Sequence, residues 1–214
     1  MVKKLSYLII LLFSISGNTT CLAGITAKEI VDKVKQKYES LQTLAAEFEQ
    51  IFQWKLAGET QTLEGKICLA QKDKYRIETQ DQTIVTDGQT VWTYSKVNRQ
   101  VIIDHLAKSQ ENPLPRDMLF QYSKDYEPKL LGEEKLNNQD CYVLQLSSKT
   151  EDRYIREMKV WVEKDTWIVR KIEHADINEN LNTYIIKKID LNPKLDDAIF
   201  TFEIPKGMEV VDLR

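Results

Sequence analysis

The stretch Gln82–Ile103, QTIVTDGQTVWTYSKVNRQVII, indicates a β-sheet protein. Its β-branched and aromatic residues favour strands, and Asp87-Gly88 predicts a two-residue type I′ turn in which both residues have positive φ. Side chains alternate between the two faces of a strand, so Trp92 and Tyr94 share one face. Two large rings on a short strand need either a covering layer of protein or a bound apolar ligand.

The segments on either side of this stretch repeat the strand pattern. Between residues 46 and 56 the even positions are mostly bulky and apolar and the odd ones mostly polar, which predicts a long antiparallel strand with one solvated face. Leu63 and Ile67 take the inner face of the next strand. Strand signals recur to the end of the chain, where the last is at Thr201–Ile204. The pattern predicts a mainly β, α+β fold in which one curled antiparallel sheet is closed on one side by helices.

Two segments predict apolar or amphipathic helices, and one further helical turn is expected at Pro193–Ile199. Thr26 and Glu29 form a capping box, and an apolar stripe at helical spacing follows them. A second, short apolar helix is expected within residues 116–122. The apolar residues of the two segments are Ile30, Val31, Val34, Tyr38, Leu41, Met118, Leu119 and Phe120.

The N-terminus predicts export. Lys3 and Lys4 precede the apolar run Leu5–Ile15, and small residues follow, which is the layout of a cleavable signal peptide over residues 1–23. The alternative is a transmembrane anchor, but the run is shorter than the roughly 20 apolar residues that span a bilayer. The residues before Cys21 do not form a lipobox. We therefore expect residues 24–214 to form a single exported domain.

Composition and motifs exclude several classes of function. The net charge of −3 and the lack of a basic run argue against nucleic-acid binding. Neither His105 nor His174 belongs to a triad or metal motif, so we expect no enzyme, no cofactor and no metal. Cys68 and Cys141 are compatible either with a disulfide in an oxidising compartment or with buried thiols.

The most distinctive residues are apolar. Large aromatic side chains gather in early strands that should be neighbours, and they form either a filled core or the lining of a cavity for long acyl chains. These aromatic residues are Phe48, Phe52, Trp54, Tyr75, Trp92 and Tyr94.

In order and spacing, the chain resembles the LolA family, the periplasmic carriers that move lipoproteins to the outer membrane. The resemblance is carried by Phe48-Glu49-Gln50, by Lys74–Ile77, by the D-G-x-x-x-W-x-Y segment that begins at Asp87, and by the closing F-x-F-x-x-P-x-G-x-x-V segment, Phe200–Val210. It extends over nearly all of the exported chain.

This resemblance implies an unclosed β-barrel of about eleven strands, with a lid of short α-helices over the apolar concave face. It also implies partners: acylated lipoproteins, an inner-membrane lipoprotein-releasing ABC transporter and an outer-membrane receptor. The resemblance further implies that the protein is a periplasmic monomer. The expected cavity residues are Phe48, Phe52, Trp54, Leu63, Ile67, Tyr75, Ile77, Trp92 and Tyr94. The expected lid residues are Ile30, Val34, Tyr38, Leu41, Met118, Leu119 and Phe120.

One position departs from the family pattern. An Arg-Pro pair that helps to hold the lid closed is replaced here by Gln71-Lys72. Neither residue reproduces the planar, bidentate contact of arginine. Two other functions stay open: a periplasmic sensor, adaptor or receptor of the same fold, and a hydrolase with an unrecognised site.

Overall fold

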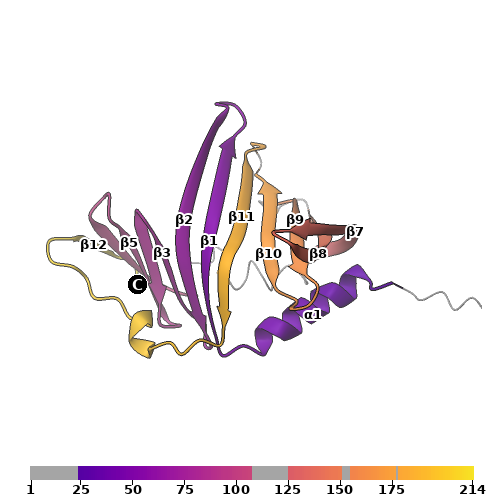
Figure 1. Cartoon of the computed structure of the whole chain (residues 1–214). Coiled ribbons are helices and arrows are strands. Elements are labelled where there is room, and N and C mark those ends of the chain that lie inside the picture. The colour runs from indigo at the N-terminus through magenta and orange to yellow at the C-terminus, as the bar shows by residue number, and fades with distance from the viewer. Residues whose placement is uncertain (1–23, 108–124, 151–154, 177) are drawn as a thin grey trace, which may run out of the picture.

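The computed structural model describes residues 24–107, 125–150, 155–176 and 178–214, and these residues form one twelve-stranded sheet with a single α-helix (Figure 1). The predicted signal peptide, residues 1–23, and the predicted helix within 116–122 lie outside the described residues. The elements in chain order are α1 (Ala27–Glu39), β1 (Thr43–Trp54), β2 (Glu59–Ala70), β3 (Lys74–Thr79), β4 (Gln82–Thr86), β5 (Thr90–Ser95), β6 (Gln100–His105), β7 (Tyr126–Leu136), β8 (Gln139–Ser148), β9 (Glu157–Glu163), β10 (Val169–Ala175), β11 (Leu181–Leu191), the 3-10 helix η1 (Asp197–Phe200) and β12 (Glu209–Asp212).

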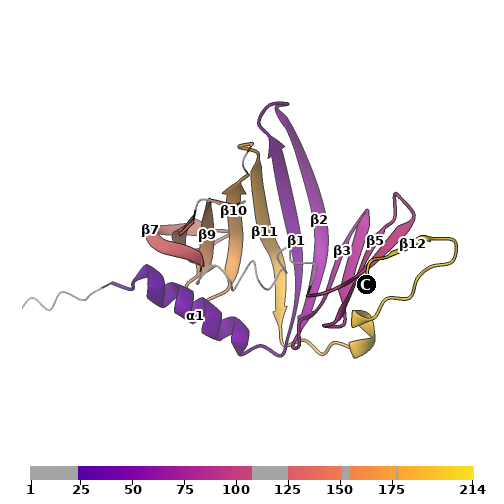
Figure 2. The same cartoon turned by 180° about the vertical axis from the view of Figure 1, so that it is seen from behind.

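The sheet is not closed into a barrel. Its strand order is β12-β6-β5-β4-β3-β2-β1-β11-β10-β9-β8-β7, so β12 and β7 are its two edges. This confirms the mainly β, unclosed fold. The last strand was expected at Thr201–Ile204 but lies at β12, which pairs with β6 in parallel. β1 and β11 join the two halves of the chain in the middle of the sheet, and α1 lies beside the half that holds β7–β10 (Figures 1 and 2).

The predicted N-terminal helix is confirmed as α1. Its capping box is formed: the Glu29 backbone N–H donates to Thr26 Oγ1 at 3.2 Å, and the Thr26 N–H donates to Glu29 Oε2 at 2.8 Å. The apolar stripe buries Ile30, Val34 and Tyr38. These side chains belong to the same buried cluster as residues of β8–β10, so α1 covers that half of the sheet.

Cross-strand pairing defines two faces of the sheet. Ala46 lies opposite Ile67, Ile67 opposite Ile77, and Ile77 opposite Ile84. Directly opposed residues point to the same side of a sheet. We call the side that carries these four residues the inner face, and the other side the outer face; α1 packs on the inner face because its buried cluster includes Ala46.

Trp92 and Tyr94 lie on the outer face, in contrast to the expectation that they line the concave face with Ile77. Tyr94 is opposite Thr83, which is opposite Glu78, and Trp92 is opposite Val85. Because Glu78 follows Ile77 along the strand, this row faces away from the inner side. The expectation assumed that large aromatic side chains on β5 face the inner side. Because β5 is covered on its outer face as well, an aromatic pair on this strand does not identify the inner face.

The C-terminal segment supplies that outer cover. Phe202 lies against Tyr94, with ring centroids 5.6 Å apart, and Phe200 is 1% exposed. Arg76 Nη1 donates to the Ile199 carbonyl at 3.1 Å, which ties η1 to β3. Tyr94 therefore has the C-terminal segment of the protein as its covering layer.

The turn at Asp87-Gly88 differs from the predicted type I′ turn, since only Gly88 of the pair has a positive φ, of 96°. Asp87 Oδ1 instead accepts hydrogen bonds from the backbone N–H groups of Gln89 and Thr90, both at 2.9 Å. A Cβ on Gly88 would lie 2.3 Å from the Lys72 carbonyl oxygen. Glycine is required here by the close approach of two turns.

Both described cysteines are free thiols. Cys141 is buried and Cys68 is half-buried, and burial raises the pKa of each thiol. The structure therefore favours free thiols over a disulfide between the two.

Candidate ligand-binding pocket

A pocket of about 480 Å³ opens on the inner face between β1–β4 and β10–β11. This volume lies within the roughly 300–1,000 Å³ range of small-molecule sites. Most of its wall is aliphatic or aromatic. The lining residues are Tyr38, Leu44, Ala46, Phe48, Gln50, Leu63, Ile67, Leu69, Tyr75, Ile77, Thr79, Gln82, Ile84, Val169, Arg170, Lys171, Ile172, Tyr184, Ile186 and Ile189.

Five of the nine expected cavity residues line this pocket, and they come from three neighbouring strands: Phe48, Leu63, Ile67, Tyr75 and Ile77. The period-two pattern places all five on the inner face. Phe52 and Trp54 lie further along β1, with ring centroids 4.4 Å apart, and do not line it. Trp92 and Tyr94 are on the outer face.

The other half of the wall was not expected from the sequence. Ile172 on β10 and Tyr184, Ile186 and Ile189 on β11 line the pocket because β11 pairs with β1. Ile189 lies opposite Ala46 in that ladder. The apolar residues within Asn182–Leu191 were a signal of a strand, but they do not alternate, because the ladder shifts register between Ile186 and Lys188, and they did not identify β1 as the partner.

Tyr38 connects α1 to the pocket. Of the described lid residues, Ile30, Val34 and Leu41 are part of the buried core, whereas Tyr38 also forms part of the wall of this pocket. Its hydroxyl oxygen accepts a hydrogen bond from the Val169 backbone N–H at 3.2 Å. Burial raises the pKa of Tyr38 to about 12, so the hydroxyl stays neutral. The expected lid residues Met118, Leu119 and Phe120 lie outside the described residues.

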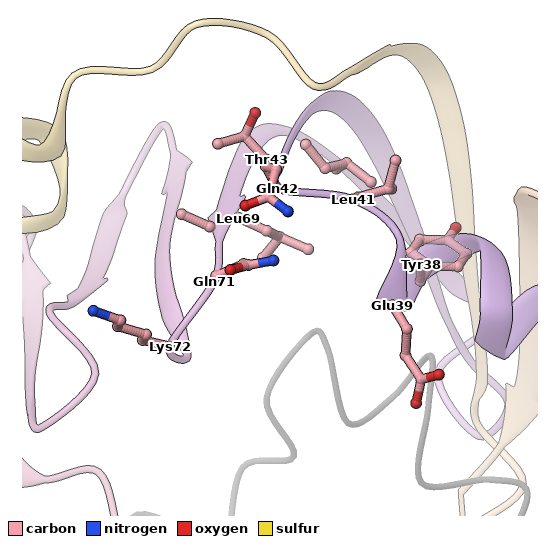
Figure 3. Close-up of a pocket in the computed structure, with 10 residues that line it drawn as sticks. Tyr38, Glu39, Leu41, Gln42, Thr43, Leu69, Gln71 and Lys72 are labelled. Carbon is pink, nitrogen blue, oxygen red and sulfur yellow. The ribbon is translucent and has the colours of Figure 1, made fainter.

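A second pocket of about 280 Å³ adjoins the first, and the two share Tyr38, Leu44 and Leu69 (Figure 3). Gln71 and Lys72, which replace the family Arg-Pro pair, form part of its rim. Figure 3 shows the Lys72 ammonium group directed away from Tyr38.

Polar side chains gather at the opposite end of the larger pocket. Gln50 and Tyr184 face each other across the β1–β11 ladder and both line the pocket. Gln50 Nε2 donates to the Tyr184 hydroxyl and to Asn182 Oδ1, each at 3.0 Å. The His174 ring stacks on Tyr184, with centroids 6.2 Å apart. We call these four residues the polar cluster.

The described residues include no group of three or more His, Cys, Asp or Glu side chains placed to hold a metal ion. Across the same ranges, the structure contains no helix that is long and apolar enough to span a bilayer. What the site offers chemically is an apolar surface with one polar end.

The chain is therefore an α+β protein with an open sheet, a helix on the inner face of that sheet and an apolar pocket beside the helix. A family model described as "Outer membrane lipoprotein carrier protein LolA" matches residues 39–203. The chain belongs to the LolA family.

Two relatives illustrate the range of similarity. An outer-membrane lipoprotein carrier protein of Histophilus somni (strain 2336) is 27% identical over 196 residues, which cover 90% of this chain and 92% of the relative. An uncharacterized protein of Methanocaldococcus jannaschii is 28% identical over 214 residues. The match covers 96% of this chain but only 60% of that relative's length.

Among solved structures, an uncharacterized conserved protein from Thermus thermophilus has a TM-score of 0.61 and 16% identity. The alignment covers 87% of this chain and 98% of that one. At this identity the likeness concerns the fold alone.

Proposed function

We propose that this protein is a periplasmic carrier that holds the acyl chains of lipoproteins in the inner-face pocket. The single observation that carries this proposal is the apolar pocket of about 480 Å³, which the described side chains leave open between β1–β4 and β10–β11. Family membership and the relatives named as carriers support it. Residues 1–23 would direct export as a cleaved signal peptide.

The energetics suit reversible binding. Each buried methylene contributes roughly 0.8 kcal/mol, so about ten buried methylenes contribute roughly 8 kcal/mol, the free energy of a micromolar complex. Part of this gain is offset by the ordering of the chain and the loss of its translational freedom. The resulting affinity would hold cargo in water and still allow its release.

In this proposal the protein takes its cargo from an inner-membrane ABC transporter and gives it to an outer-membrane receptor. The transfer involves no covalent step. Its direction follows from differences in affinity at each transfer, because a ligand moves toward the partner that binds it more tightly. α1 would act as a lid, with Tyr38 as its contact to the pocket wall.

The test places a charge in the pocket. Ile67→Glu puts a carboxylate among apolar side chains, where an unpaired charge is strongly unfavourable beside an acyl chain. Thr62→Glu is the matched control, because it makes the same change in charge on the same strand, at an exposed position. Each variant is purified from the periplasm of the native host, and the acylated peptides that accompany it are quantified by mass spectrometry.

We expect the Thr62→Glu protein to retain acylated lipoprotein and the Ile67→Glu protein to lose at least about nine-tenths of it, as a penalty of roughly 1.4 kcal/mol or more implies. Circular dichroism checks that both remain folded. Equal recovery of lipoprotein with both folded variants would show that the cargo does not occupy this pocket.

A further inference from the structure

The polar cluster has hydrogen-bonding capacity that the described protein does not use. The Tyr184 oxygen accepts from Gln50, which leaves the Tyr184 hydrogen available to donate. His174 is 6% exposed, and its Nδ1 has no hydrogen-bond partner in the part of the chain that the structure describes. Buried polar atoms without partners are costly and rare in folded proteins. Of the four residues of the polar cluster, Gln50 and Tyr184 line the pocket, so a ligand in the pocket can reach the unused Tyr184 hydrogen.

The charges around the cluster decide which kind of polar group fits. Burial raises the pKa of Tyr184 and lowers the pKa of His174, so both are neutral at pH 7. Asp176 is the ionised group that interacts with His174, and it is negative. A second anion placed here would be both repelled and buried without a partner, which costs several kcal/mol.

The basic residues that border the pocket do not change this conclusion. Arg170 is paired with Glu163 at 2.7 Å and Lys171 with Glu173 at 2.9 Å. Gln50 bridges Asn182 and Tyr184 through its side-chain amide, and all three side chains are uncharged. The cluster therefore offers neutral donors and acceptors to a ligand rather than a positive charge.

We propose that the polar cluster recognises the uncharged carbonyl group of an acyl ester or amide, which accepts a hydrogen bond from the Tyr184 hydroxyl. The alkyl chain then runs from this end over Phe48 and Ile186 toward Tyr38 and Leu69. The pocket thus selects esterified or amide-linked acyl chains over free fatty acid anions. This inference rests on the proposed function, since it concerns the same pocket.

The test compares three probes that share one alkyl length: methyl palmitate, palmitate and hexadecane. Their affinities are measured by displacement of a fluorescent naphthylamine dye at neutral pH. We expect the unmodified protein to bind methyl palmitate at least about tenfold more tightly than palmitate, because the carboxylate would be buried without a countercharge. This comparison needs no variant.

The role of Tyr184 is tested with Tyr184→Phe, which keeps the ring and removes the hydroxyl. We expect a loss of about three- to tenfold in affinity for methyl palmitate, the value of one neutral hydrogen bond, with hexadecane unaffected. Tyr142→Phe is the control, because Tyr142 stacks on Trp167 and does not line the pocket. It should change neither affinity.

The outcomes separate the two proposals. Palmitate binding as tight as that of methyl palmitate, or a Tyr184→Phe protein with unchanged affinity for the ester, would overturn the carbonyl site while leaving an acyl-binding pocket. Failure of all three probes to bind the unmodified protein would overturn the acyl-binding pocket itself, and with it both proposals.

Discussion

Gly65 shapes the pocket wall through the side chain that it lacks. It lies opposite Phe48 in the β1–β2 ladder, and the Phe48 ring lies over it. A Cβ at position 65 would be 2.5 Å from Phe48 Cζ and 2.8 Å from the Glu78 carbonyl oxygen. The Phe48 ring could rotate away, but the Glu78 carbonyl belongs to the backbone of β3. Rotation of Phe48 alone therefore does not make room for a larger residue at position 65.

Gly65→Ala should therefore destabilise the protein. We expect a loss of about 1–3 kcal/mol in the free energy of unfolding, because overpacking against a rigid backbone forces a local shift. The measurement is the urea midpoint, with Thr62→Ala at an exposed position of the same strand as control. A midpoint equal to that of the unmodified protein would mean that β3 moves freely at Glu78.

At the scale of elements, α1 is held at both ends by different means. Its first turn is fixed by the capping box, which is local in sequence. Near its other end, Tyr38 is fixed by the hydrogen bond from Val169, which connects α1 to β10. Release of the end at Tyr38 would uncover the pocket wall, because Tyr38 lines the pocket and the residues of the first turn do not.

Tyr38→Phe removes this contact and leaves the Val169 N–H buried without its phenolic partner. We expect a cost of about 1–3 kcal/mol, and we expect it to appear mainly as easier local opening of α1. Hydrogen–deuterium exchange of the α1 amides should then be faster by about tenfold or more, as a difference of 1.4 kcal/mol implies. Tyr142→Phe is again the control, and α1 exchange at an unchanged rate in Tyr38→Phe would show that this bond does not hold the helix.

The sequence predicts those elements whose signals are local. The capping box and apolar stripe identified α1, and the period of two put Phe48, Ile67 and Ile77 on the inner face. The same period could not assign the face of Trp92, since β5 is covered on both sides. The contribution of β10 and β11 to the pocket depends on the β1–β11 ladder, and pairing between strands so distant in the chain is not encoded in any local pattern.

For the whole molecule, the sheet carries buried side chains on both faces. α1 covers the inner face of β7–β10, while the C-terminal segment with Phe200 and Phe202 lies on the outer face at β3 and β5. The pocket lies on the inner face of the central strands, beside α1 and on the opposite face from the C-terminal segment. Stability contributed by the outer cover should therefore be separable from binding in the pocket.

Phe200→Ala tests this separation. Phe200 is 1% exposed, and truncation of a buried phenylalanine costs about 3–5 kcal/mol. We expect the urea midpoint to fall accordingly, while the affinity of the remaining folded protein for methyl palmitate changes by less than about twofold, a difference under about 0.5 kcal/mol. Phe202→Ala, at a partly exposed position, should cost less. A parallel loss of stability and affinity would mean that the two faces are coupled through the sheet.

The ladder between β1 and β11 has a consequence for the newly made chain. The strands β1–β4, which form one side of the pocket, are synthesised early, whereas the other side is complete only when β11 (Leu181–Leu191) has been added. Closing the long loop between β1 and β11 is entropically expensive before the two strands meet. A chain that still lacks β11 therefore has only the part of the pocket wall that β1–β4 provide. In the function proposed above, such a chain could not hold an acyl chain, so binding would begin only after β11 has paired with β1.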